Sequence, residues 1–174
     1  MAEPQRTYVT QEFLEKMKEE LTQLKTKKRA EVAQRLKEAI AMGDLSENSE
    51  YDDAKNEQAF VEGRILTLEK MIRNAKVIKD SEINKKVVSL GSQVTIKDME
   101  TEEEEEYTVV GTTEADPMAD PPRISNESPV GKAILGQKVG SVCKVPTPAG
   151  ELSYKIVSIA KPSAGKKKKA AAKE

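Results

Sequence analysis

Apolar residues in the first 80 positions recur at the spacing of helices. An early stripe advances by three or four residues, as a narrow coiled-coil seam does, through Leu14, Met17, Leu21 and Leu24. It then drifts in steps of four, with Lys28 inside it, to Val32, Leu36 and Ile40. A second stripe of similar length runs through Val61, Ile65, Leu68, Ile72 and Ala75. Two such stripes separated by one short break predict an antiparallel helical hairpin, an arm on the order of 45 Å long.

The ends of the two predicted helices carry capping residues. Thr10 is placed to cap the first helix, and Gly43 to end it in a left-handed conformation. Helicity is expected to resume at about Ser49, where Ser49-x-x-Asp52 resembles a capping box, although Ser46 is an alternative cap. Residues 43–53 therefore form the tip of the hairpin.

The second half of the chain changes to strand and turn signals. No proline occurs between Gln5 and Asp116, and only two glycines precede Gly91. The pattern predicts strand, turn and strand in 87–98, a strand in 107–111 after the glutamate run 102–106, a short helix in 128–136, and a hairpin of 141–148 with 151–159. An α+β protein of two domains follows from these assignments.

Four segments result. Residues 1–79 form the helical hairpin with its tip at 43–53, residues 80–86 a charged linker, and residues 87–160 a small antiparallel β-sheet domain with one short helix. Residues 161–174 are rich in lysine and of low complexity, so we expect a disordered basic tail. That tail either adds solubility or assists association with nucleic acid or an acidic surface.

The amino-acid composition limits the kinds of catalytic, metal-binding and disulfide sites that this chain can form. With 34% charged residues, two Phe and no Trp, the chain favours long exposed helices, and its net charge of −1 gives no sign of a general nucleic-acid binder. The absence of histidine removes the usual general base and zinc ligand. The single Cys143 excludes an internal disulfide, and its apolar surroundings predict a buried hydrophobic residue. Without a long apolar run or a signal peptide, a cytoplasmic protein with no membrane partner is expected.

The tip segment GDLSENSEYDDAKNEQ, residues 43–58, has six carboxylates and one lysine, with no other basic partner nearby. One interpretation is a solvated loop whose acids favour a helix N-terminus. A calcium loop is excluded, because Ser49 stands where glycine is required and Lys55 where a bidentate glutamate is required. A third interpretation is a rigid arm that carries Mg²⁺ ligands, Asp44 and Glu47, into the active site of another protein.

Several strings in order resemble one known family. They are the tip segment followed by VEGRI, then GTTEADP, ISNESPVGKAILG and TPAGELSYKI. Together, from about Thr10 to Ile159, they closely resemble bacterial Gre transcript-cleavage factors of the GreA type. The resemblance implies a coiled coil that enters the secondary channel of bacterial RNA polymerase, and a second domain of FKBP-like fold that docks on the channel rim.

The resemblance also implies roles for tip residues. Asp44 and Glu47 match two acids that help to bind a second Mg²⁺ and orient the attacking water in the polymerase active site. Ser46 and Tyr51 belong to the same motif, and Lys55 falls where a base contacts RNA or polymerase. The chain would then be a monomer and no enzyme itself, with no cofactor beyond the shared Mg²⁺. It would stimulate hydrolysis near the 3′ end of backtracked nascent RNA.

Some features depart from the family or leave other functions open. Ile40 stands where some members carry a base, which predicts a weaker grip on extruded RNA and a preference for short backtracks. An inhibitory paralogue that occludes the channel is an alternative against which Asp44 and Glu47 argue. A helical chaperone with an FKBP-like isomerase is another, against which the shortage of aromatic residues in the second half argues.

The two phenylalanines and one basic cluster, all in the first half of the chain, each allow a structural and a binding interpretation. Phe13 and Phe60 are isolated, so packing is favoured over stacking on nucleic acid. The basic cluster 27–29 halfway along the arm suits either a solvated helix face or contact with polymerase or RNA.

Overall fold

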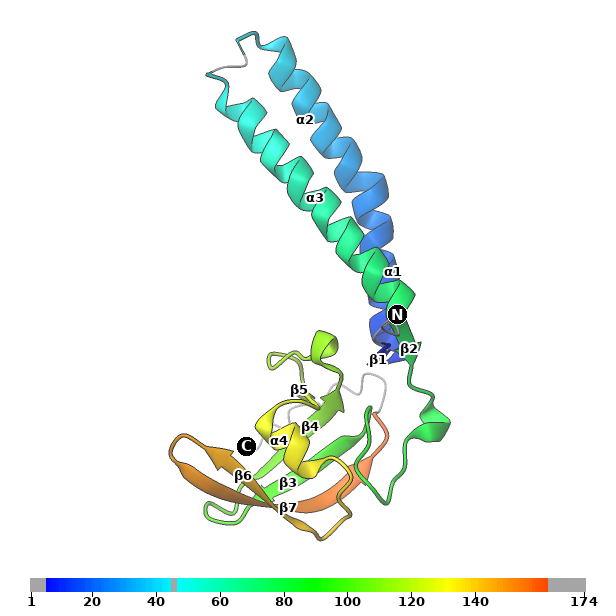
Figure 1. The fold of residues 1–174 in the computed structure, drawn as a ribbon, viewed down its shortest axis with the longest axis vertical. Helices are drawn as coiled ribbons and strands as arrows, with labels where there is room; N and C mark the ends of the chain where they lie inside the picture. The colour runs from blue at the N-terminus through cyan, green and yellow to red at the C-terminus, as the bar shows by residue number, and fades with distance from the viewer. Residues whose placement is uncertain (1–5, 45–46, 163–174) are drawn as a thin grey trace, which may run out of the picture. The chain divides into compact units, whose positions relative to one another are not determined.

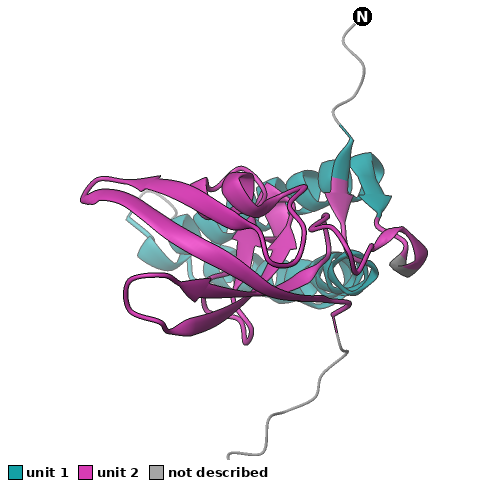
Figure 2. Cartoon of the chain, turned by 90° about the horizontal axis from the view of Figure 1, so that it is seen from below, with its two compact units in different colours: residues 1–7, 11–77 teal, residues 8–10, 78–174 magenta. Residues whose placement is uncertain are grey.

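The computed structural model describes residues 6–44 and 47–162. The chain divides into two compact units, drawn in different colours in Figure 2. The first, here called the hairpin unit, comprises Met1–Thr7 and Gln11–Val77. The second, the sheet unit, comprises Tyr8–Thr10 and Ile78–Glu174. The first unit is built mainly of helices and the second mainly of strands.

The hairpin unit is a pair of long antiparallel helical arms (Figure 1). The first arm consists of α1 (Gln11–Gln23), a π-helical turn η1 (Leu24–Lys28) and α2 (Arg29–Ala41). The second arm is α3 (Ser49–Asn74), whose 26 residues extend about 40 Å at the usual helical rise. The predicted hairpin is thereby confirmed. The chain continues into β2 (Ala75–Val77), which pairs with β1 (Thr7–Val9), so Ala75 opens a strand instead of ending the helical stripe.

The π-helical turn explains how the drifting stripe stays on one face. In a helix of 3.6 residues per turn, each four-residue step rotates the stripe by about 40°. Between Leu24 and Arg29 the helix is wider, because the Arg29 N–H donates to the Leu24 carbonyl five residues back. The wider turn offsets part of this rotation. Val32 is thus buried with Val61 and Ile65 of α3, and Leu21, Leu24 and Leu36 pack around them.

Phe60 corrects one expectation about this core. Its side chain is 73% exposed, whereas the neighbouring Val61 is only 3% exposed. A helix turns by about 100° per residue, so a residue directly before a seam position points away from the seam. Phe13, at the start of the first arm, is half-buried.

The sheet unit holds a five-stranded sheet with the strand order β5-β4-β3-β7-β6. Its strands are β3 (Gln93–Asp98), β4 (Glu104–Val110), β5 (Arg123–Ser125), β6 (Val142–Thr147) and β7 (Gly150–Ala160). One α-helix, α4 (Pro129–Ile134), and two 3₁₀ turns, η2 (Asp80–Glu82) and η3 (Thr112–Glu114), complete the unit. The predicted short helix and the hairpin of the last two strands are confirmed, with Thr147 opposite Gly150.

One predicted strand is absent from the structure, and one strand of the structure was not predicted. Residues 87–90 form no strand, and Val87 makes only an isolated bridge to Lys138. Instead, the chain turns at Gly91, whose φ is +84°. The sheet also gains a short strand, β5, that lies parallel to β4, so it is mixed and not wholly antiparallel.

The core of the sheet unit lies between the sheet and α4. Its buried residues are Val88, Val94, Ile96, Val109, Ile134, Cys143, Ile156 and Ile159. Cys143 is 5% exposed, as predicted for a small hydrophobic residue, and burial raises the pKa of its thiol. No helix among the described residues is long and apolar enough to cross a membrane.

A buried carboxylate ties the segment before α1 into the sheet unit. Glu114 is 2% exposed and accepts hydrogen bonds from the Thr10 backbone N–H at 2.9 Å and the Thr10 hydroxyl at 2.5 Å. The Arg123 guanidinium donates to the same carboxylate at 3.2 Å. These donors satisfy the hydrogen-bonding capacity that burial would otherwise leave open.

Candidate functional site at the hairpin tip

The first arm ends where the sequence predicted. After Ala41 the Met42 N–H donates to the Ala39 carbonyl at 3.2 Å, and the Gly43 N–H donates to the Ile40 carbonyl at 3.4 Å. Gly43 has a φ of +108°, which side chains with a Cβ atom rarely adopt. The glycine therefore turns the chain out of the helix and into the tip.

Asn48, and neither Ser49 nor Ser46, is the N-cap of α3. Its side-chain oxygen accepts a hydrogen bond from the Tyr51 N–H at 3.2 Å. Its Nδ2 donates to the Ala39 carbonyl in the last turn of α2, at 2.8 Å. The predicted capping box is thus wrong by one residue. Asparagine is as good an N-cap as serine, so its place directly before Ser49 was the available signal.

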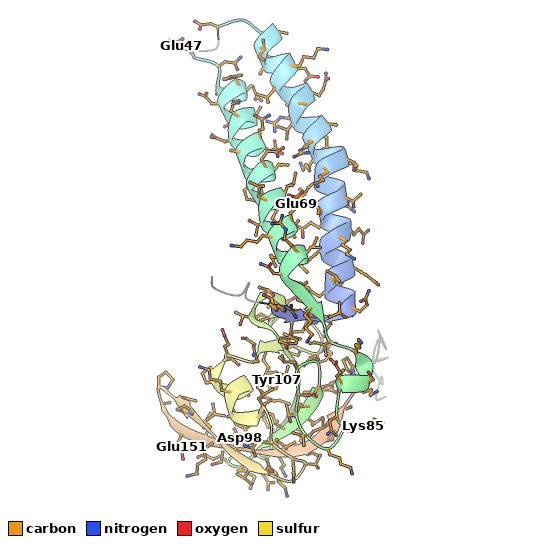
Figure 3. All side chains as sticks on the ribbon, turned by 45° about the vertical axis from the view of Figure 1, so that its right-hand side comes forward. Glu47, Glu69, Lys85, Asp98, Tyr107 and Glu151 are labelled. Carbon is orange, nitrogen blue, oxygen red and sulfur yellow. The ribbon has the colours of Figure 1, made fainter. Side chains whose placement is uncertain are left out.

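The two predicted tip acids lie between these fixed ends. Asp44 follows Gly43 and Glu47 precedes Asn48, and both side chains are exposed. Figure 3 shows Glu47 at the end of the hairpin, beyond the helices. Ser46 lies outside the described residues. The structure therefore places both acids at one end of a rigid arm, where they are accessible to a partner.

The other two predicted contact residues lie further along, in the first turns of α3. Tyr51 is half-buried and Lys55 is exposed, one helical turn apart and so on neighbouring positions of one face. The Lys55 Nζ donates to the side-chain oxygen of Gln58 at 3.1 Å. Lys55 thus has a local hydrogen bond that leaves its exposed ammonium open to further acceptors.

Two acids in the first turns of α3, Glu50 and Glu57, have basic partners on the first arm that lie far from them in sequence. Glu50 lies 3.7 Å from Arg35 of α2, and the same guanidinium also contacts Glu57. Lys28 reaches Glu57 as well, with Nζ at 3.1 Å from its carboxylate. The expectation that these acids lack a basic partner is therefore wrong for Glu50 and Glu57.

The basic cluster 27–29 is also partly engaged within the hairpin. Besides the pair of Lys28 with Glu57, Arg29 pairs with Glu62 at 2.7 Å, and nearby Lys25 pairs with Glu69 at 2.5 Å. The hydrogen bond from Lys28 is the largest cause that lowers the pKa of Glu57. Lys28 and Arg29 thus link the two arms, which favours a role in holding the hairpin straight.

Metal binding by the tip alone has little support from the donor set. In the described part of the chain no group of three or more Asp, Glu, His or Cys residues is placed to hold a metal ion. Two exposed carboxylates offer hard oxygen ligands of the kind that Mg²⁺ prefers, but Mg²⁺ sites of this type are completed by phosphates and water. The two tip carboxylates therefore suit part of a Mg²⁺ site whose other ligands come from elsewhere better than a complete Mg²⁺ site.

Comparison with known proteins identifies the family. A family model described as "Transcription elongation factor, N-terminal" matches residues 7–77, and one described as "Transcription elongation factor, GreA/GreB, C-term" matches residues 83–161. The transcription elongation factor GreA of Acetivibrio thermocellus is 54% identical over 161 residues, which cover 92% of this chain and all of that protein. GreA of Thermoanaerobacter pseudethanolicus is 58% identical over 153 residues, covering 88% of this chain and 96% of the relative.

Solved structures give weaker likenesses. The crystal structure of GreA factor homolog 1 (Gfh1) of Thermus thermophilus matches with a TM-score of 0.42 and 30% identity, covering 89% of this chain and 99% of that one. A GreA/GreB factor from Nitrosomonas europaea matches with a TM-score of 0.39 and 32% identity, over 56% of this chain and 79% of that one. The two family models and the GreA relatives together span nearly the whole sequence. The chain belongs to the GreA/GreB family of transcription elongation factors.

Proposed function

We propose that this elongation factor binds bacterial RNA polymerase and inserts its helical hairpin into the secondary channel. There it donates Asp44 and Glu47 to the polymerase active site. The stimulated reaction is hydrolysis of a phosphodiester near the 3′ end of backtracked RNA, which leaves a new 3′-OH in register for extension. The chain acts as a monomer and contributes ligands and reach, while the polymerase supplies the rest of the catalytic site.

One observation carries this proposal: both exposed acids lie in the short connection between Gly43 and Asn48, at the end of an arm about 40 Å long. An arm of this length reaches a site that the bulk of a second protein would cover. The ion pairs between the arms resist bending and keep that reach constant. A solvated loop of no function needs neither the length nor the stiffness.

The carboxylate pair fits a shared Mg²⁺ ion. Mg²⁺ bound in such a site would polarise the phosphate oxygens and the attacking water. Asp44 and Glu47 supply oxygen ligands and hydrogen-bond acceptors, by which they hold the attacking water and orient it toward phosphorus. Lys55, exposed on α3, offers its ammonium to the RNA backbone or to polymerase. Tyr51, half-buried at the start of α3, is a further contact in this proposal, as is Ser46, which lies outside the described residues.

The test follows RNA cleavage in a stalled, backtracked elongation complex with labelled RNA and Mg²⁺. Native protein is compared with Asp44→Asn, Glu47→Gln and a reaction without factor. Asp53→Asn removes one exposed carboxylate from α3 and serves as the matched control for charge. We expect the tip variants to lose most of the stimulation, at least tenfold, while they still compete with native protein for polymerase. The control variant should stimulate as native protein does.

Two results would contradict the proposal. Full stimulation by both tip variants would show that the carboxylates are not used. A native protein that binds polymerase and stimulates nothing would favour the channel-occluding alternative.

A further inference from the structure

One side chain at the tip, that of Asn48, is hydrogen-bonded to both arms. The amide of Asn48 spans from the first turn of α3, where its oxygen accepts from the Tyr51 N–H at 3.2 Å, to the last turn of α2, where its Nδ2 donates to the Ala39 carbonyl at 2.8 Å. It is half-buried, whereas both tip acids are exposed. Asn48 therefore belongs to the structural base of the tip and not to its contact surface.

These two bonds fix both ends of the segment that bears the acids. Asp44 lies five residues after Ala39, and Glu47 is bonded directly to Asn48. If the bond to Ala39 is lost, the N-terminus of α3 is free to shift relative to the end of α2, and the separation of the two carboxylates shifts with it. A shift of about 1 Å at a catalytic group can cost on the order of a hundredfold in rate.

Asparagine meets this double demand in a way that other N-cap residues do not. Aspartate caps a helix equally well but has no donor for the Ala39 carbonyl. Serine caps as well, yet its single hydroxyl has no amide N–H₂ to reach the other arm. The pair of bonds therefore requires a side chain whose acceptor and donor are two separate atoms, as in an amide, so that each can reach a different arm.

We propose that Asn48 is a positioning residue for the cleavage reaction, which sets the relative placement of Asp44 and Glu47 through its bond to the Ala39 carbonyl. This inference rests on the proposed function of the tip acids. It assigns to Asn48 a role that its helix cap alone does not require.

The experiment separates the two bonds of Asn48 by substitution. Asn48→Ser and Asn48→Asp keep an oxygen cap and lose the amide N–H₂ that reaches the Ala39 carbonyl, whereas Asn48→Ala loses both. Asn56→Ser, at an exposed position of α3, is the control. Cleavage of backtracked RNA is measured against factor concentration, so that the maximal rate and the half-saturating concentration are obtained separately.

We expect Asn48→Ser and Asn48→Asp to lower the maximal rate by tenfold to about a hundredfold. The half-saturating concentration should remain within about twofold of native, because binding surfaces outside the tip are unchanged. A residue needed only for helix stability would give the opposite result: the cap-retaining variants would match native protein, and only Asn48→Ala would lose activity.

A second measurement uses the full chain without polymerase. Amide hydrogen exchange at Met42 and Gly43, whose N–H groups donate to the Ala39 and Ile40 carbonyls, should become faster in Asn48→Ser, while the amides of Val61 and Ile65 in the seam keep their native protection. Unchanged exchange at the tip would overturn the inference even if cleavage fell.

The outcomes distinguish this inference from the proposed function. Native stimulation that is lost in Asp44→Asn but undiminished in Asn48→Ser and Asn48→Asp overturns the role of Asn48 alone. A native chain that stimulates no cleavage overturns both.

Discussion

The guanidinium of Arg29 donates from Nε and Nη2 to the two carboxylate oxygens of Glu62, at 2.7 Å each, across the hairpin. Such a bidentate pair fixes orientation as well as distance. A second pair of the same kind joins Arg64 of α3 to Glu20 of α1, at 2.7 and 3.0 Å. The two arms are therefore held together by paired charges along their flanks in addition to the apolar seam.

This pairing makes the stability of the hairpin depend on pH. The hydrogen bond from Arg29 lowers the pKa of Glu62 below its ordinary value of 4.5, against the opposing effect of desolvation. A carboxylate with a depressed folded-state pKa stabilises the fold above its unfolded pKa and loses that contribution as pH falls through the folded value. We expect the native melting temperature to fall below about pH 4.5, and Glu62→Gln to show a smaller fall. Thermal melts followed by circular dichroism across this range measure the difference.

The control for this prediction is Glu19→Gln, which removes one exposed carboxylate from α1. Its pH dependence should follow the native curve. Because the Arg29 and Glu62 side chains are both more than 40% exposed, added salt should also reduce the difference between native protein and Glu62→Gln. Parallel curves for native protein and Glu62→Gln would contradict the assignment.

Two large side chains of α3 should respond in opposite ways to truncation. Ile65 is 2% exposed in the seam, so Ile65→Ala leaves a cavity and should destabilise the hairpin by about 2–5 kcal/mol. Phe60 is 73% exposed, so Phe60→Ala should change stability by no more than about 0.5 kcal/mol. Denaturant unfolding of both variants checks the pair. A loss of several kcal/mol in Phe60→Ala would mean that Phe60 packs in the fold after all.

Periodicity was sufficient to predict the hairpin, because a two-arm coiled coil buries residues at regular intervals of local sequence. Gly43 could likewise be predicted, since the need for a positive φ is local. The π-helical turn at Leu24–Lys28 was visible only as a drift of the stripe with Lys28 inside it. A helix can keep a drifting apolar stripe on one face either by bending or by forming a wider turn. The sequence alone does not show which of the two occurs.

The sheet was harder to predict because its pairings are not local. The strand β5 has three residues and lies parallel to β4, whose partner residues are 15 positions earlier, as in the pair Thr108 and Arg123. So short a segment shows no alternation of its own. At the tip, both acids could be placed from spacing and resemblance, but the link from Asn48 to Ala39 could not. It joins residues nine positions apart through a geometry that only the folded hairpin creates.

Tyr107 should ionise late in an alkaline titration. Burial, followed by the hydrogen bond that its hydroxyl donates to Glu105 at 2.8 Å, raises its pKa to about 12. Because the unfolded chain ionises near pH 10, the stabilisation from neutral Tyr107 is complete below that pH and is lost as pH rises toward 12. Ultraviolet titration of tyrosinate should show a late component in native protein that Tyr107→Phe reduces, and burial also raises the pKa of Tyr154. A late component of undiminished size in Tyr107→Phe would contradict this.

A pair of glycine-to-alanine substitutions tests how closely each unit is packed. At Gly131 in α4, an added Cβ would lie 2.0 Å from the Ser125 carbonyl oxygen, a backbone atom that cannot move aside alone. The backbone N–H of Gly131 also donates to the hydroxyl of Ser128, the N-cap of α4, at 3.0 Å. Gly131→Ala must therefore displace α4 from β5, and overpacking of this kind typically costs about 1–3 kcal/mol or more.

Gly63 provides the matched comparison. It lies inside α3, and an added Cβ there meets nothing within 4 Å. Because alanine loses less backbone entropy than glycine in a helix, Gly63→Ala should stabilise the hairpin by roughly 0.5–1 kcal/mol. Calorimetry of the full chain measures both variants under the same conditions. A stabilised Gly131→Ala would mean that α4 can move away from Ser125 at no cost. A destabilised Gly63→Ala would mean that this face of α3 is covered in solution, because nothing in the hairpin itself opposes the added methyl group.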